Sequence, residues 1–489
     1  MPVASTISAA SAASTASGAS IESTVVTSAA SIVTPELLRE FDQNGPRYTS
    51  YPTADRFVEA FSADDYVQAL TQRRSGGAAL ALPLSVYVHI PFCESLCYYC
   101  ACNKIITRHH EKGAAYLHYL GREVDLHTAQ MGVGQTVSQL HLGGGSPTFL
   151  NDDELRALMA MLRRSFTLAP GGEYSIEVDP RTVDAARLQV LAALGFNRLS
   201  FGVQDFDLAV QKAVHRVQPM EQVFALVESA RKIGFESINV DLIYGLPKQT
   251  PESFDRTLAQ VCELRPDRVA LYAYAHLPER FKPQRRIATA ELPPGAARIA
   301  MLSGALRAFE KAGYVYVGMD HFALPGDSLA IAKRHGRLHR NFQGYSTQPD
   351  CDLVALGVSA IGRIGAVYSQ NAKTLEEYYD RLDQGRLPVV RGLALSRDDL
   401  VRRAIIMALM CQGRLQYESI ELGYLIDFRS YFRPEIMALE VLAAQGLVVL
   451  ASDGIEVTAK GWFFVRAVAM VFDRYLQADR NRARFSRIL

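Results

Sequence analysis

Four of the seven cysteines in this chain of 489 residues lie within ten positions: Cys93, Cys97, Cys100 and Cys102. Crowded thiolates repel one another unless a metal neutralises them, and soft thiolate ligands select zinc, copper(I) or iron–sulfur clusters. The first three follow the spacing C-x3-C-x2-C. Three such cysteines can bind three irons of a cubane cluster and leave the fourth iron open. Because a closed four-cysteine cluster mainly transfers electrons, an open iron predicts a cluster that binds and reduces a ligand.

A structural zinc site is the simpler alternative for these cysteines. Such a site needs four closing ligands, usually as two pairs well separated in the sequence. The chain has no second C-x2-C pair, and Cys102 is too close to Cys100 in the sequence to serve easily as the fourth ligand of a tetrahedral zinc site. His109 and His110 could complete a site, but we expect them at a helix start in solvent. The spacing therefore favours a cluster with three cysteine ligands, in which Cys102 has no assigned role.

The composition indicates which partners the chain is not built for and which compartment suits its thiols. The chain carries 52 basic and 51 acidic side chains, so its charge predicts neither a nucleic-acid partner nor a membrane surface. It has no run of about 18 apolar residues, and we expect no membrane span. Cys262, Cys351 and Cys411 are isolated and predicted to be buried, unpaired thiols. This thiol usage favours a reducing, cytoplasmic compartment. A monomer is the default expectation.

Short apolar segments alternate with amphipathic ones between residues 85 and 278. Strands are predicted over residues 85–92, 137–142, 173–178, 198–203, 237–243 and 268–274. Helices are predicted between them, over residues 114–129, 152–165, 184–194, 221–233 and 251–264. Strands that alternate with helices of this length indicate βαβ units and a parallel sheet. Six such units predict an α/β fold built as a partial or complete barrel, with its chemistry at the C-terminal strand ends.

Polar and flexible residues follow these strands. The second predicted strand runs into Gly143-Gly144-Gly145, and Glu177, Gln204 and Asp241 follow later strands. Glycines allow a close backbone approach to an amino-acid moiety or a phosphate. The turn lacks G-x-G-x-x-G spacing and a P-loop lysine, so it does not predict a nucleoside-triphosphate site. A carboxylate can accept hydrogen bonds from both hydroxyls of a ribose. Arg216 could pair with a ligand carboxylate, although a supporting role or a surface ion pair is an equal alternative for any single residue.

The chain divides into five predicted regions. Residues 1–34 are rich in Ser and Ala, lack Lys and Arg, and are expected to form a disordered tail rather than a targeting signal. Residues 35–84 form a segment that covers the substrate. Residues 85–280 form the barrel core, and residues 281–395 form an extension and linker. Residues 396–489 are predicted to form a mostly helical C-terminal domain.

The cysteine loop on the first strand and the glycines after the second resemble the radical S-adenosylmethionine enzymes. A closer resemblance is to the oxygen-independent coproporphyrinogen III oxidases, and it runs from about Leu37 to the last residue. The segments that carry it are residues 45–53, 89–93, 100–104, 241–247, 318–323, 339–345 and 357–361. The resemblance implies a partial (β/α)6 barrel of the radical S-adenosylmethionine type, with an N-terminal extension and a mostly helical C-terminal domain.

The resemblance also implies an activity and a set of ligands. Members of this family oxidatively decarboxylate two propionates of coproporphyrinogen III to the vinyl groups of protoporphyrinogen IX in haem biosynthesis, by means of a 5′-deoxyadenosyl radical. The [4Fe–4S] cluster would be bound by Cys93, Cys97 and Cys100. One S-adenosylmethionine would contact Tyr87, Gly144, Glu177 and Ile361. A second would contact Tyr99, Gly145, Ser146, Gln204, Arg216, Asp241 and Ala275. Tyr99 and Ser146 depart from the family pattern of Phe and Thr but keep its aromatic and hydroxyl character.

The expected partners are coproporphyrinogen III and an electron donor such as a flavodoxin-type reductant. Arg47 is a hypothetical contact to the carboxylates of the substrate. The main alternative is a haem chaperone, related to the same family, that binds haem without turnover. Cys102, the segment 47–52 and the long C-terminal domain favour the oxidase.

Overall fold

The computed structural model describes residues 34–41, 44–76 and 82–478. The predicted disordered tail, apart from Thr34, lies outside the described residues. Among the described residues, none of the helices is both long and apolar enough to span a membrane.

A curved sheet of twelve strands forms the centre of the molecule, in the order β16-β15-β14-β13-β1-β4-β5-β6-β7-β8-β10-β9. The six predicted strands are confirmed as neighbours in this sheet and pair in parallel. They are β1 (Leu84–Ile90), β4 (Gln135–Gly144), β5 (Phe166–Val178), β6 (Arg198–Gln204), β7 (Ser237–Tyr244) and β8 (Arg268–Ala273). Their apolar side chains are almost fully buried, as expected for a parallel sheet covered by helices.

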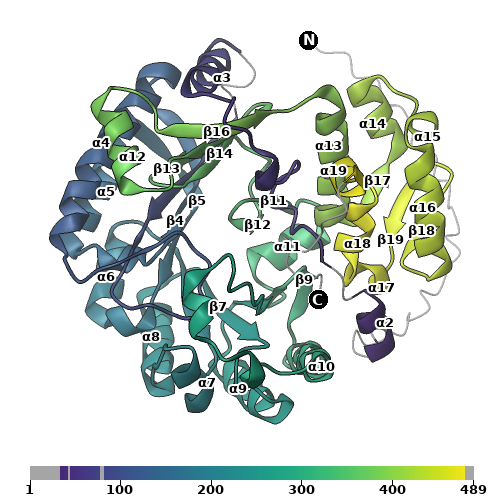
Figure 1. The fold of residues 1–489 in the computed structure, drawn as a ribbon, viewed down its shortest axis with the longest axis horizontal. Coiled ribbons are helices and arrows are strands. Elements are labelled where there is room, and N and C mark those ends of the chain that lie inside the picture. The colour runs from purple at the N-terminus through teal and green to yellow at the C-terminus, as the bar shows by residue number, and fades with distance from the viewer. Residues whose placement is uncertain (1–33, 42–43, 77–81, 479–489) are drawn as a thin grey trace, which may run out of the picture.

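The predicted helices connect these strands and pack on the outside of the sheet (Figure 1). They are α4 (Glu111–Met131), α5 (Asp152–Ser165), α6 (Ala185–Ala193), α8 (Met220–Ile233) and α9 (Pro251–Leu264). Local signals set their starts. Asn151 and Glu154 form a capping box before α5, and Thr250 and Ser253 form another before α9. All the parallel strands therefore point their C-terminal ends toward one rim.

Residues beyond the predicted barrel extend the sheet at both edges. On one edge β13 (Leu353–Leu356) pairs in parallel with β1, and antiparallel strands follow it: β14 (Ile361–Ile364), β15 (Val367–Asn371) and β16 (Val389–Ala394). On the other edge β10 (His321–Ala323) and β9 (Val315–Gly318) continue from β8. The sequence analysis predicted none of these strands, because segments of three to six residues have too few positions to show a clear period.

Further helices, turns and short strands join these parts. They are α2 (Pro35–Glu40), η1 (Ala54–Arg56), α3 (Ala63–Ser75), β2 (Phe92–Cys93), β3 (Ile105–Ile106), η3 (Pro147–Phe149), η4 (Pro180–Thr182), α7 (Leu208–Ala213), η5 (Lys282–Arg286), η6 (Thr289–Glu291), α10 (Gly295–Lys311), α11 (Ser328–Arg334), β11 (His339–Asn341), β12 (Gly344–Ser346) and α12 (Leu375–Asp383).

The C-terminal region is mostly helical, as predicted, and lies beside the open side of the sheet (Figure 1). It contains α13 (Arg397–Gln412), α14 (Tyr417–Tyr424), α15 (Phe428–Tyr431), α16 (Arg433–Ala444), α17 (Ala459–Trp462), α18 (Val465–Met470) and α19 (Arg474–Ala478). A small antiparallel sheet completes it: β17 (Arg414–Gln416), β18 (Val448–Leu450) and β19 (Gly454–Val457). The division of the chain into five regions stays a prediction.

Residues 44–58 connect the sheet to the C-terminal region. The Tyr48 hydroxyl donates to Asp473 Oδ2 at 2.9 Å, and Arg466 Nε donates to the carbonyl of Pro46 at 3.1 Å. Val58 forms a bridge with Gly392 in β16. Tyr48 and Tyr51 are fully buried at this contact. The N-terminal segment is therefore part of the core.

Candidate functional site

The cysteine loop follows β1 and borders a cavity of about 410 Å³ at the C-terminal strand ends. Cys93, Cys97, Cys100 and Cys102 all line this cavity. Backbone hydrogen bonds hold the loop at both ends, from Ile105 to the Pro91 carbonyl at 2.7 Å and from Thr107 to the Cys93 carbonyl at 2.9 Å. The fold therefore brings the predicted ligands to one wall of one cavity.

The thiols of this loop are close enough to affect one another. Burial raises the pKa of Cys93 to about 12, with a further increase from the charges of Cys100 and Cys97. A hydrogen bond from Cys102 lowers the pKa of Cys100 to about 6. Such mutual repulsion is what a bound cationic cluster relieves, so the donor set fits a thiolate-bound metal group.

The described residues contain no group of three or more His, Cys, Asp or Glu side chains that could hold a single metal ion. This arrangement is compatible with a cubane, because cysteines that bind different irons stand farther apart than the ligands of one ion. His109 and His110 are exposed where α4 begins, as expected.

The glycine turn after β4 packs directly against the cysteine loop. The Gly145 amide donates to the Ile90 carbonyl and the Ser146 amide to the Phe92 carbonyl, both at 2.8 Å. A Cβ on Gly145 would lie 2.7 Å from the carbonyl oxygens of Pro91 and Phe92, and a Cβ on Gly144, whose φ is +113°, would lie 2.6 Å from the His89 ring. The close approach of the two strand ends therefore requires glycine at positions 144 and 145, independently of any ligand.

Glu177, near the end of β5, faces the same turn. Its Oε2 accepts from the Gly144 amide at 3.1 Å, and its Oε1 lies 3.3 Å from His141 Nε2. Burial raises the pKa of Glu177, but the hydrogen bonds from His141 and Gly144 outweigh it and hold the pKa below its usual value. Tyr87 stacks on the His141 ring, with centroids 5.9 Å apart. Glu177 is therefore an ionised acceptor at the rim.

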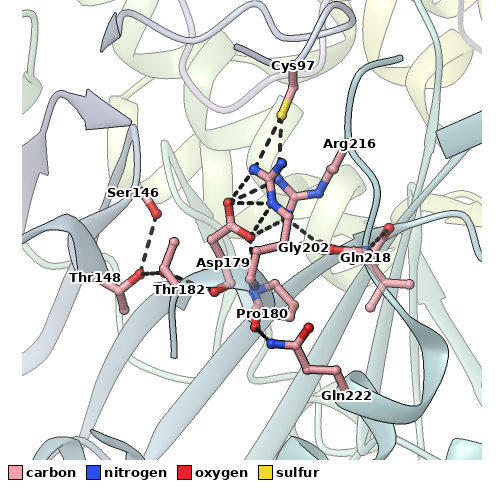
Figure 2. A network of polar contacts seen from close by, with 12 residues as sticks. Cys97, Ser146, Thr148, Asp179, Pro180, Thr182, Gly202, Arg216, Gln218 and Gln222 are labelled. Atoms are coloured by element: carbon pink, nitrogen blue, oxygen red, sulfur yellow. Dashed lines mark hydrogen bonds and ion pairs between the residues drawn. The ribbon is translucent and has the colours of Figure 1, made fainter. Parts of the chain in front are cut away.

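A second polar network connects the end of β5 to the cysteine loop (Figure 2). Arg216 donates to both carboxylate oxygens of Asp179, at 3.2 and 3.3 Å, and to Cys97 Sγ at 3.5 Å. Arg181 donates to Asp179 at 2.6 Å and to Cys97 Sγ at 3.8 Å. Burial opposes ionisation of Asp179, yet the charges of Arg216 and Arg181 lower its pKa to about 2. Two guanidinium groups thus face one of the predicted ligand sulfurs.

The sequence analysis singled out Arg216 but missed Asp179 and Arg181. Asp179 lies two residues beyond Glu177, and side chains two apart share one face of an extended chain, so the alternation could have indicated it. Arg181 belongs to the short helix η4, for which the sequence has no periodic signal.

Asp241 lies on β7 and lines the cavity beside Tyr272. Its carboxylate accepts from Asn239 at 2.9 Å and from Ser200 at 3.3 Å. Burial, together with the charge of Glu177, raises the pKa of Asp241 to about 7. Gln204, where β6 ends, has a φ of +70°, a left-handed conformation that is uncommon for a residue other than glycine. Both residues are held in costly states at the same rim, which is typical of functional sites.

The structure brings eight of the eleven predicted cofactor contacts to the cavity: Tyr99, Gly144, Gly145, Ser146, Glu177, Gln204, Arg216 and Asp241. Tyr87, Ala275 and Ile361 do not line it. Tyr87 packs behind His141, and Ala275 is joined to Tyr99 through Gln284, whose Nε2 donates to both carbonyls at 3.2 and 3.0 Å. Ile361 is the first residue of β14. The roles of all these residues stay predictions.

Comparisons with known proteins agree with this geometry. A family model described as the radical SAM superfamily matches residues 87–261, and one described as the HemN C-terminal domain matches residues 395–464. The chain is 51% identical to an oxygen-independent coproporphyrinogen III oxidase of Pseudomonas aeruginosa, over 93% of this chain and 98% of that protein. The corresponding Escherichia coli protein is 48% identical over 93% of this chain and 98% of its own length.

A solved structure provides the same match in three dimensions. The coproporphyrinogen III oxidase HemN from Escherichia coli, described as a radical SAM enzyme, superposes with a TM-score of 0.84 and 48% identity. The alignment covers 88% of this chain and all of that one.

Proposed function

This chain belongs to the oxygen-independent coproporphyrinogen III oxidases of the radical S-adenosylmethionine superfamily, and on that premise we propose that it oxidatively decarboxylates two propionates of coproporphyrinogen III to form protoporphyrinogen IX in haem biosynthesis. The observation that carries the proposal is the 51% identity over almost the whole chain, together with three cysteines on one wall of the barrel cavity.

The residues of the cavity divide into a cluster side and a cofactor side. Cys93, Cys97 and Cys100 would hold a [4Fe–4S] cluster, and the residues listed above as predicted contacts would hold S-adenosylmethionine, with two molecules in the proposal. When bound, these groups supply reductive cleavage of the sulfonium to a 5′-deoxyadenosyl radical that can remove a hydrogen atom from a propionate.

The charged side chains on this rim have roles that follow from their ionisation states. Ionised Glu177 can accept hydrogen bonds from hydroxyl or ammonium groups. Asp241, whose pKa is raised to about 7, can accept them when ionised and can donate one when protonated. Arg216 and Arg181 direct positive charge at Cys97 and balance the charge of its thiolate. The segment 44–58, in which Tyr48 and Tyr51 are fully buried, would help to exclude water from a reactive radical.

Some features of the proposal rest on the sequence alone. An electron donor, such as a flavodoxin-type reductant, is proposed as a partner, and the protein is proposed to act as a monomer in the cytoplasm. The haem chaperone alternative is not favoured, because the similar proteins named above are oxidases along their full length.

The function is tested by anaerobic incubation of the reconstituted protein with reductant, S-adenosylmethionine and coproporphyrinogen III. We expect a divinyl product, methionine and 5′-deoxyadenosine. Cys97→Ser should remove cluster absorbance and activity. Cys351→Ser, at a buried thiol outside the cavity, is the matched control and should keep both. Tight haem binding without vinyl product by the wild type would overturn the proposal in favour of the chaperone.

A further inference from the structure

Three arginines from distant parts of the chain meet beside the cavity: Arg47 of the N-terminal segment, Arg340 of β11 and Arg466 of α18. We refer to them as the arginine cluster. Arg340 Nε donates to the Arg47 carbonyl at 3.3 Å, and Arg466 donates to the carbonyls of Gly45 and Pro46. Arg340 and Arg466 are about 95% buried or more. The fold thus places two buried arginines beside Arg47, whose side chain is 30% exposed.

The cluster borders the cavity through Tyr272. The Arg47 guanidinium lies 5.2 Å from the centroid of the Tyr272 ring, and Tyr272 lines the same cavity as the cysteine loop. The His321 ring stands edge-on to Tyr272, with centroids 6.3 Å apart. A ligand that occupied the cavity and extended past Tyr272 would therefore meet positive charge.

Arg340 is the arginine of this cluster that lacks a carboxylate partner among the described residues. Asp320 pairs with Arg47. Arg340 forms no ion pair with a described residue, and its buried Nη1 has no hydrogen-bond partner among them. Burial lowers the pKa of Arg47 to about 10 and that of Arg466 to about 9, and neighbouring arginines of the cluster lower both further. Clustered buried cations are costly unless an anion binds to them.

We propose that the arginine cluster binds a carboxylate of the substrate, with Arg340 Nη1 as its main donor. The guanidinium group suits this ligand because its planar fork matches a carboxylate in bidentate geometry. Coproporphyrinogen III carries propionate carboxylates, so the inference rests on the proposed function and adds the group that recognises the substrate. The carboxylate held here is one that is not being decarboxylated, and it anchors the macrocycle with another propionate toward the cysteine loop.

The inference is tested by binding of coproporphyrin III, the fluorescent oxidised form of the substrate, which carries the same propionates. Full-length reconstituted protein is titrated anaerobically. We expect Arg340→Gln to weaken binding about tenfold or more, the loss expected for a charge-assisted hydrogen bond. Arg73→Gln, at a buried arginine that pairs with Asp352 outside the cluster, is the matched control and should bind as the wild type does. Unchanged binding by Arg340→Gln would overturn the inference.

A second variant covers the case in which Arg340→Gln does not fold. Asp320→Asn removes the carboxylate that already occupies Arg47, so it should bind coproporphyrin III more tightly than the wild type, a gain that general damage cannot produce. Equal or weaker binding by Asp320→Asn would count against the cluster as a carboxylate site. The two proposals are separable. Wild-type protein that forms no vinyl product contradicts the proposed function, whereas normal wild-type turnover with unaltered binding by the variants contradicts only this inference.

Discussion

At the scale of single residues, charge compensation around Cys97 is the main result. Asp179 accepts hydrogen bonds from Arg216 and Arg181, and both arginines also face the sulfur of Cys97. The three side chains are mostly buried, so each depends on the others for its charged state. The carboxylate therefore holds two cations that would otherwise repel each other and move the cysteine loop.

Asp179→Asn should destabilise the protein by about 2–4 kcal/mol, because it leaves two buried guanidinium groups without their carboxylate. The stability that Asp179 contributes is present above pH 4 and is lost as the pH falls toward its folded pKa of about 2. Urea denaturation at pH 7 and pH 3 measures both effects.

Asp153→Asn is the control for this substitution. Asp153 forms an ion pair with Arg156 but is 94% exposed, so its loss should change the stability by less than about 0.5 kcal/mol. Equal effects of the two substitutions would contradict the role assigned to burial.

Asp241 predicts a pH dependence of the opposite sign. Its pKa of about 7 in the folded protein lies above its usual value of 3.8, so the folded state binds the proton more tightly than the unfolded state does. The contribution of Asp241 to stability therefore falls as the pH rises from about 4 to 7.

Asp241→Asn lacks this titration. The stability of this variant relative to the wild type should rise across the same pH interval by about 1–3 kcal/mol. This is less than the full pKa shift implies, because the carboxyl lines an open cavity and solvent screens its charge. Denaturant unfolding of both proteins at a series of pH values provides the measurement. A difference that does not change with pH would contradict the raised pKa.

At the scale of elements, the glycine turn after β4 determines where the cysteine loop lies. Gly145→Ala would place a methyl group 2.7 Å from backbone atoms of Pro91 and Phe92, the two residues before Cys93. Backbone atoms cannot move aside as the end of a flexible side chain can, so the cysteine loop must shift. We expect this variant to lose most of its cluster iron after reconstitution and to be destabilised by about 1–3 kcal/mol.

Gly295→Ala is the matched glycine substitution. It lies at the first position of α10, has no atom within 4 Å of the added methyl group, and has an ordinary φ. It should bind a full complement of iron and gain up to about 1 kcal/mol of helix stability. Iron and sulfide analysis of both variants checks the prediction, and full iron content in Gly145→Ala would disprove it.

At the scale of the whole molecule, the barrel and the C-terminal region share one interface. Trp462, the single tryptophan of the chain, donates from Nε1 to the Val317 carbonyl of β9 at 3.0 Å. Tyr345 donates to the Met410 carbonyl of α13 at 2.9 Å, and Tyr48 reaches Asp473 from the N-terminal segment. These contacts are buried, so we expect the two regions to unfold together.

Tryptophan fluorescence, which reports on this interface, and far-ultraviolet circular dichroism, which reports on the helices and strands of both regions, should therefore give the same denaturation midpoint. Tyr48→Phe removes one buried hydrogen bond and should lower the free energy of unfolding by about 1–2 kcal/mol. Both denaturation midpoints should therefore fall together. A fluorescence transition that precedes the circular dichroism transition would show that the C-terminal region unfolds independently.

The local pattern of the sequence was sufficient for much of this molecule. The cysteine spacing, the six central strands and the helices between them depend on residues close in sequence, and the polar residues after those strands were expected at one rim because parallel strands end there. Eight of the predicted contacts accordingly line one cavity.

Only the tertiary structure decided the rest. The strands β9, β10 and β13 to β16 are too short to show a clear period. Their place in the sheet follows from two pairings with strands distant in the chain, β13 with β1 and β10 with β8. The contacts of Asp179 with Arg216 and of Arg47 with Arg340 join residues that no local pattern relates. Whether a charged side chain is compensated depends on what packs around it, and packing is a property of the folded chain rather than of any segment.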